Sequence, residues 1–175
     1  MTCIAVKIES KKITIAGDTQ TTWGNHKLPK KDYVDNNLKA AGKIFQTNGM
    51  TLGCAGATAH IGLFQIFCKS HKPKEMERDS ILDWFLEFRD WISSKAKINF
   101  TDLSMHSIII NDGRVFCFFD FMDIWEVKTF DSVGSGMWLA IGAMDLGASA
   151  DRAVEAAIKY DLYCGGKVTK IEIKK

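Results

Sequence analysis

The chain has 175 residues, of which 46% are hydrophobic and 25% are charged, a composition typical of a globular domain with a buried core. Its 23 basic and 21 acidic residues give a net charge of +2, which argues against a protein that binds nucleic acid or a membrane surface. No apolar run approaches the length of a membrane span or a secretory signal. The sequence therefore predicts a cytoplasmic protein with one domain over residues 1–175.

The first third of the chain has the pattern of β-hairpins. Apolar residues alternate from Thr2 onward, and a second apolar run at 13–16 follows a turn at Ser10 and Lys11. Residues 19–42 are polar and form a long excursion. Two further strands, 43–47 and 50–55, flank an Asn-Gly pair, which is the strongest short signal for a hairpin.

Helical spacing follows at 61–68 and, more clearly, at 81–92. Ser80 and Asp83 resemble a capping box at the start of the second helix. We assign its broad apolar stripe to the core, and we expect part of the surface between Trp84 and Trp91, or its neighbour helix, to lie in a subunit interface.

Strands return in the second half of the chain and are followed by two more helices. We expect strands at 106–110, 114–119, 123–129 and 167–173, and helices after Gly136 and from Ser149. Two β-rich blocks, with a helix pair after each, predict an α+β fold: a four-layer αββα sandwich.

The five cysteines and four histidines do not have the spacing of a metal or disulfide site. The cysteines are odd in number, have no CxxC pair and lie mostly in apolar surroundings, which favours reduced, buried thiols. No two histidines are four residues apart, so a zinc site is not expected, and neither is any cofactor. The Gly-Ser-Gly at 134–136 is no nucleophile elbow, because Val133 stands where glycine would be needed.

Thr2 offers a different chemistry. If Met1 is removed, as is common before a small residue, Thr2 carries a hydroxyl and a free α-amine together. The amine has an ordinary pKa of about 7.7–8.0, near the pH at which a general base is most effective, and such an amine can activate a threonine hydroxyl. Alternatively, threonine is simply a small residue after the initiator, and the terminus alone favours this second interpretation.

Several motifs in order favour the first interpretation. The opening TCIAVKIESKKITIAGDTQTTWGN resembles that of proteasome β-type subunits and above all of the HslV (heat-shock-locus V) peptidase, with Thr2 and Asp18 at the separation found in that family. GKIFQ matches the segment of the family's catalytic lysine, at Lys43, and CAGATA the segment that supplies the oxyanion-hole N–H, at Gly56. Gly-Ser-Gly matches the serine that binds the threonine amine, at Ser135, and DLYCGG matches a supporting segment through Asp161 and Cys164.

The resemblance implies an N-terminal-nucleophile hydrolase: a threonine-type endopeptidase subunit of a self-compartmentalising protease. Its implied partners are polypeptide substrates, other copies of the chain in hexameric or heptameric rings stacked in pairs, and a separate ATPase unfoldase. A small-molecule amidase of the same fold and a catalytically silent structural ring subunit remain alternatives. Taken singly, most of these site residues could also be ordinary turn or surface residues.

Three features depart from the family pattern. Residues 19–42 are longer than usual, His60 stands where aspartate is common, and Cys164 replaces a serine. None of them removes Thr2, Asp18 or Lys43, so we expect a working site.

Overall fold

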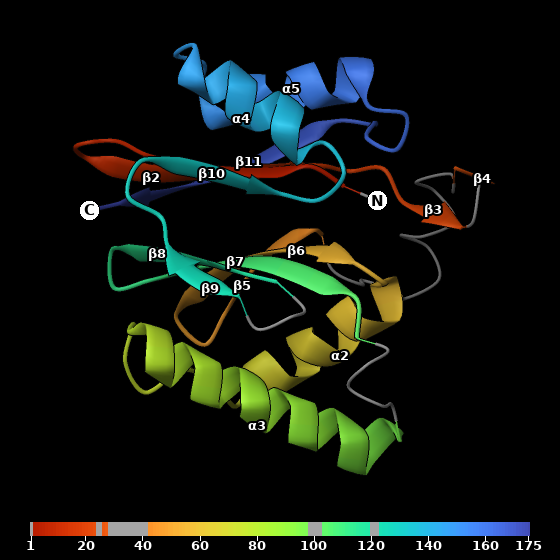
Figure 1. Ribbon diagram of the computed structural model, residues 1–175, viewed down its shortest axis with the longest axis vertical. Coiled ribbons are helices and arrows are strands. Elements are labelled where there is room, and N and C mark those ends of the chain that lie inside the picture. Colours follow the sequence, from red (N-terminus) through yellow and green to blue (C-terminus); the bar gives the residue numbers. More distant parts are fainter. Residues whose placement is uncertain (1, 24–25, 28–41, 98–102, 120–122) are drawn as a thin grey trace.

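The structure is a computed structural model that describes residues 2–23, 26–27, 42–97, 103–119 and 123–175. Figure 1 shows four layers. Helices α4 (Met137–Asp145) and α5 (Ala150–Tyr160) cover a four-stranded sheet, and α2 (Thr58–Cys68) and α3 (Arg78–Ala96) cover a five-stranded sheet. The αββα sandwich predicted from the order of the elements is confirmed.

Both large sheets are antiparallel. The four-stranded sheet has the order β10-β1-β2-β11, with strands Phe130–Val133, Ile4–Ile8, Lys12–Asp18 and Val168–Lys174. The five-stranded sheet runs β5 to β9 in chain order, with strands Ile44–Thr47, Met50–Gly56, Met105–Asn111, Arg114–Phe118 and Ile124–Glu126. A small ribbon pairs β3 (Thr22–Trp23) with β4 (His26–Lys27).

Local turn chemistry accounts for two of the hairpins. Asn48 and Gly49, between β5 and β6, have φ of 50° and 81°, and Asp112 and Gly113, between β7 and β8, have φ of 50° and 72°. Positive φ at both central residues is the backbone that a two-residue hairpin requires, and asparagine, aspartate and glycine adopt it most easily.

The strand predicted at 123–129 is wrong, because the chain changes sheets within it. β9 pairs with β8 in the five-stranded sheet, whereas β10, which was not predicted, pairs with β1 in the four-stranded sheet. The change takes two residues: the Val127 N–H still donates to Val115 O of β8, and Thr129 O already accepts from Ile8 N of β1. Alternation of apolar residues suits either sheet, so it could not locate the crossing.

Two helix and strand ends also differ from prediction. The capping box is wrong: α3 begins at Arg78 with no side-chain cap, and the Ser80 hydroxyl instead accepts a hydrogen bond from Glu75 N, 3.0 Å away. The first strand begins at Ile4 rather than Thr2. Even so, Asp18 N donates to Cys3 O, which continues the pairing of this end of the chain beyond β1.

The aromatic stripe of α3 lies in the core of the chain. Trp84 is only 2% exposed and packs with Phe64 and Phe67 of α2, so this part of the stripe belongs to the core. An interface on the rest of this surface, or on its neighbour helix, stays a prediction. Large exposed apolar side chains occur on α2 at Ile66 and, in and beside the opposite helix layer, at Trp138, Leu146 and Leu162. Within the described ranges, no helix is long and apolar enough to span a membrane.

Phe64 should be a main contributor to stability. Its fully buried ring contacts those of Trp84, Phe88 and Phe118, which joins both helices of this layer to the five-stranded sheet. Phe64→Ala should lower the free energy of unfolding by about 3–5 kcal/mol, since it removes apolar contacts and leaves a cavity. Ile66→Ala, at a half-exposed position of the same helix, should cost much less in chemical denaturation. Similar losses for the two variants would contradict this packing.

Candidate active site

A buried ion pair joins the two sheets. Asp18 is the last residue of β2, Lys43 directly precedes β5, and Lys43 Nζ lies 2.7 Å from Asp18 Oδ1. The side chain of Asp18 is 0% exposed and that of Lys43 is 13% exposed. Both residues were predicted site residues, and the structure brings them into direct contact.

Backbone N–H groups fix the carboxylate of this pair. Cys3 N donates to Oδ1 over 2.9 Å, while Gly165 N and Gln20 N donate to Oδ2 over 3.0 and 3.3 Å. One oxygen, Oδ1, therefore binds both the Lys43 ammonium and the N–H that immediately follows Thr2. This places the ion pair beside the backbone of the predicted nucleophile.

Burial controls the ionisation of Lys43. Removal from water lowers the pKa of its ammonium, and the Asp18 carboxylate opposes that effect. A charge in such a place is tolerable only with a well-placed partner of opposite sign. The pair thus fixes the Lys43 ammonium group in one place at the end of β2.

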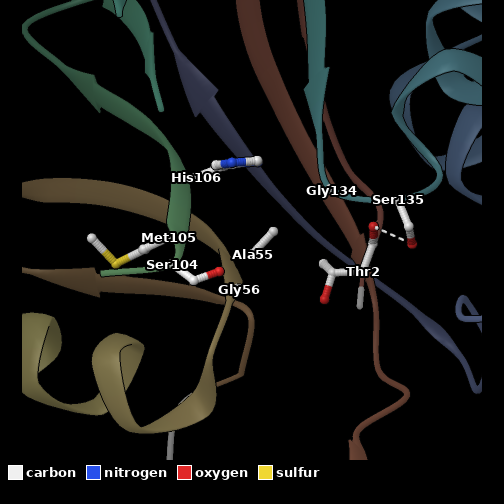
Figure 2. Close-up of a pocket in the computed structure, with 8 residues that line it drawn as sticks. All are labelled: Thr2, Ala55, Gly56, Ser104, Met105, His106, Gly134 and Ser135. Carbon is white, nitrogen blue, oxygen red and sulfur yellow. Dashed lines mark hydrogen bonds between the residues drawn. The ribbon is translucent and has the colours of Figure 1, made fainter. Parts of the chain in front are cut away.

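Thr2 lines a pocket of about 350 Å³ between the two sheets. The other lining residues are Ala55, Gly56, Ser104, Met105, His106, Gly134 and Ser135. Figure 2 shows the Thr2 hydroxyl on the side of Gly56 and Ser104, with its carbonyl turned toward Ser135. Gly56 ends β6 with a φ of 136°, a conformation that side chains disfavour, and it is exposed to the pocket.

The Gly-Ser-Gly segment holds Thr2 through its carbonyl. Gly136 N donates to Thr2 O over 3.3 Å, and the Ser135 hydroxyl lies 3.4 Å from the same oxygen. Gly134 has a φ of 99°, and a Cβ at that position would be only 2.1 Å from Thr2 O. A side chain at position 134 would therefore displace Thr2, which explains the glycine.

Ser135 connects Thr2 to the turn after α5. Its hydroxyl is 3.3 Å from Asp161 Oδ1 and 3.9 Å from Cys164 Sγ. Asp161 Oδ1 also accepts hydrogen bonds from Tyr163 N and Cys164 N, at 2.7 and 3.0 Å, and these shape the turn. The sequence predicted that Ser135 binds the Thr2 amine; in this chain that nitrogen is the Met1–Thr2 amide, and Ser135 contacts the carbonyl.

The two thiols beside the site are buried and weakly acidic. Burial raises the pKa of Cys3 and that of Cys164 to about 12, so both are protonated near neutral pH. All five cysteines lie in the described part of the chain and are buried and free of disulfides, as predicted. Cys164 is therefore a weak hydrogen-bonding partner of Ser135 rather than an anionic one.

The other six predicted site residues thus gather around Thr2. Thr2, Gly56 and Ser135 line one pocket, Asp18 and Lys43 are joined to it through Cys3 N, and Asp161 and Cys164 through Ser135. Sequence reasoning missed the support from Gln20 and Gly165, whose backbone N–H groups hold Asp18. Gly165 falls within the DLYCGG segment and could have been suspected, whereas nothing in the sequence indicates Gln20.

Comparison with known proteins identifies similar structures but no similar sequence family. No protein-family model and no curated protein matches the chain. Thiobacillus denitrificans BPH in complex with epoxomicin has a TM-score of 0.84 and 22% identity over 98% of both chains. BPH alone has a TM-score of 0.82 and 23% identity over 98% of this chain and 97% of that one.

Eukaryotic HslV from Trypanosoma brucei is also similar, with a TM-score of 0.73 and 17% identity over 99% of both chains. Identities this low establish shape rather than activity. The fold of this chain is thus the one that its sequence predicted through the resemblance to proteasome β-type subunits and HslV.

Proposed function

We propose that this chain is a threonine-type endopeptidase subunit whose nucleophile is Thr2. The observation that carries the proposal is the shared Asp18 oxygen, which binds the Lys43 ammonium and the N–H following Thr2. This contact holds the Lys43 ammonium beside the backbone that follows Thr2, and the hydroxyl of Thr2 faces a pocket. Such an arrangement suits a nucleophile that must become an alkoxide during attack.

In the proposed mechanism, Thr2 Oγ attacks the carbonyl carbon of a peptide bond and its proton passes to the free Thr2 amine, directly or through water. The Lys43 charge favours the developing alkoxide and keeps the nearby amine neutral. The Gly56 N–H stabilises the oxyanion of the tetrahedral intermediate. The amine then protonates the leaving nitrogen, and water hydrolyses the acyl-enzyme.

Ser135 and Asp161 orient the Thr2 amine in this proposal, with Cys164 as a weaker third partner. The hydroxyl of Ser135 is already within reach of Thr2 O and Asp161 Oδ1. Once the residue before Thr2 is removed, the new amine adds a further partner near this hydroxyl.

The mechanism requires a free amine on Thr2, so active enzyme should lack Met1. Intact mass and N-terminal sequencing of the active fraction check this, and a fraction that retains Met1 should be inactive. Full activity from protein that still carries Met1 would refute the mechanism, because an acylated amine cannot accept the proton.

We extend the proposal to the assembly. Residues 1–175 form one peptidase domain, and several copies associate into a ring that hydrolyses polypeptides. A separate cytoplasmic ATPase supplies the ring with unfolded chains. The exposed apolar residues of the α4–α5 layer support association between copies, because such surface is typical of interfaces.

Light scattering tests the assembly. The particle should have several times the chain mass of 19.6 kDa. A monodisperse monomer at micromolar concentration would contradict the ring, whereas hydrolysis of peptides tests the nucleophile separately. Inhibition by epoxomicin, which one of the similar structures contains, provides a second test of the site.

A further inference from the structure

The first turn of α2 carries a side chain that the proposed mechanism does not use. His60 is partly buried, and its Nδ1 accepts a hydrogen bond from Ser104 N, 3.2 Å away. A backbone N–H can only donate, so Nδ1 must be unprotonated and the proton of the neutral ring lies on Nε2. The contact joins the start of α2 to the residue before β7, 44 positions away along the chain.

Ser104 in turn holds the backbone at Gly56. Gly56 and Met105 form the last pair of the β6–β7 ladder, and Ala57 N donates to Ser104 O over 2.9 Å just beyond it. A Cβ on Gly56 would lie only 2.2 Å from the same Ser104 oxygen. The Gly56 peptide is therefore packed directly against Ser104.

His60 and Ala57 therefore bind the same residue: the Ser104 N–H donates to His60, and Ser104 O accepts from Ala57, which directly precedes α2. Gly56 and Ser104 both line the pocket that contains Thr2. We propose that His60 is a positioning residue, which fixes the Gly56 N–H toward the oxyanion by holding Ser104. The inference rests on the proposed function, since it assigns a role within that same site.

The required chemistry is a hydrogen-bond acceptor at the position of Nδ1. Asparagine can supply it, because its Oδ1 is separated from Cα by the same number of bonds as Nδ1 of histidine. Leucine has similar bulk and no acceptor. His60→Asn should therefore keep the contact with Ser104, and His60→Leu should lose it.

Peptide hydrolysis by assembled enzyme tests the role in catalysis. His60→Leu should lower kcat by about 10- to 100-fold with little change in KM, since a displaced donor weakens only the transition state. The inhibition constant of a peptide boronate, which forms a tetrahedral adduct on the nucleophile, should rise in parallel. His60→Asn should stay close to wild type in both measurements.

His71→Leu is the matched control for loss of a histidine near α2. His71 lies beyond the C-terminal end of α2, where it stacks on Phe67 and its Nδ1 lies 3.0 Å from Phe67 O. This variant should retain wild-type kcat. An equal loss in His71→Leu, or equal losses in His60→Asn and His60→Leu, would overturn the inference.

Amide hydrogen exchange provides a readout that needs no activity. The Ala57 and Ser104 amides should exchange faster in His60→Leu than in wild type, and at the wild-type rate in His60→Asn. Unchanged exchange in His60→Leu would overturn the inference. If wild-type enzyme hydrolyses no peptide, the proposed function fails, and the exchange rates alone then decide whether His60 holds this strand end.

Discussion

Thr2→Ala should abolish peptide hydrolysis and leave the particle assembled. The substitution removes the hydroxyl and one methyl group next to β1, while the backbone contacts of Thr2 O with Gly136 N and Ser135 remain available. Loss of a hydrolase nucleophile reduces turnover by roughly 10⁴–10⁶-fold. The measurement is hydrolysis of short fluorogenic peptides by size-selected assemblies.

Thr2→Ser is the matched control, because serine keeps both the hydroxyl and the α-amine, and it should retain measurable turnover. Substantial hydrolysis by Thr2→Ala assemblies would show that another residue is the nucleophile. Cys3 would then be the first candidate, to be tested by adding Cys3→Ser. Its full burial and raised pKa make it a poor nucleophile, so we expect the double variant to behave like Thr2→Ala.

The elements that the sequence predicts well are those whose signal is local. Asn48-Gly49 and Asp112-Gly113 specify hairpins because these residue types adopt positive φ cheaply, wherever the strands later pack. The helix at 81–92 was predictable because its apolar stripe has one period over many residues. In each case a few neighbouring residues determine the backbone.

The crossing near residue 128 could not be predicted, because it depends on which sheet offers the better partner. Val127 and Thr129 bond to different sheets although they are only two residues apart. Both sheets accept alternating apolar residues, so only the tertiary arrangement decides. The same limit applies to Ser80, which binds the backbone of the preceding segment instead of capping α3.

The candidate site divides in the same way. Thr2, Asp18 and Lys43 follow from motifs with a defined order, whereas the N–H groups that hold Asp18 come from Cys3, Gln20 and Gly165. Backbone donors carry no sequence signal, since every residue except proline has one. The link from His60 to Ser104 is hidden for the same reason.

Lys43→Met should reduce turnover by about 100- to 1,000-fold, with assembly retained. Methionine preserves most of the volume of the lysine side chain but removes its charge. Removing a group that stabilises charge developing in the transition state typically costs about 10²–10³-fold in kcat. The kcat of peptide hydrolysis by size-selected assemblies is the measurement.

Lys43→Met should also lower the free energy of unfolding by about 3 kcal/mol, which is the lower end of the cost of breaking a buried ion pair. The cost should lie at the lower end because the N–H groups of Cys3, Gln20 and Gly165 still donate to Asp18. Lys12→Met is the matched control: Lys12 lies 2.9 Å from Glu172, but this pair is exposed and screened by water, so its loss should change stability little. Its kcat should equal that of wild type. Wild-type kcat in Lys43→Met would show that the buried charge only supports the fold. A loss of kcat in Lys12→Met as large as that in Lys43→Met would show that turnover depends on the total charge of the protein and not on the ion pair beside Thr2.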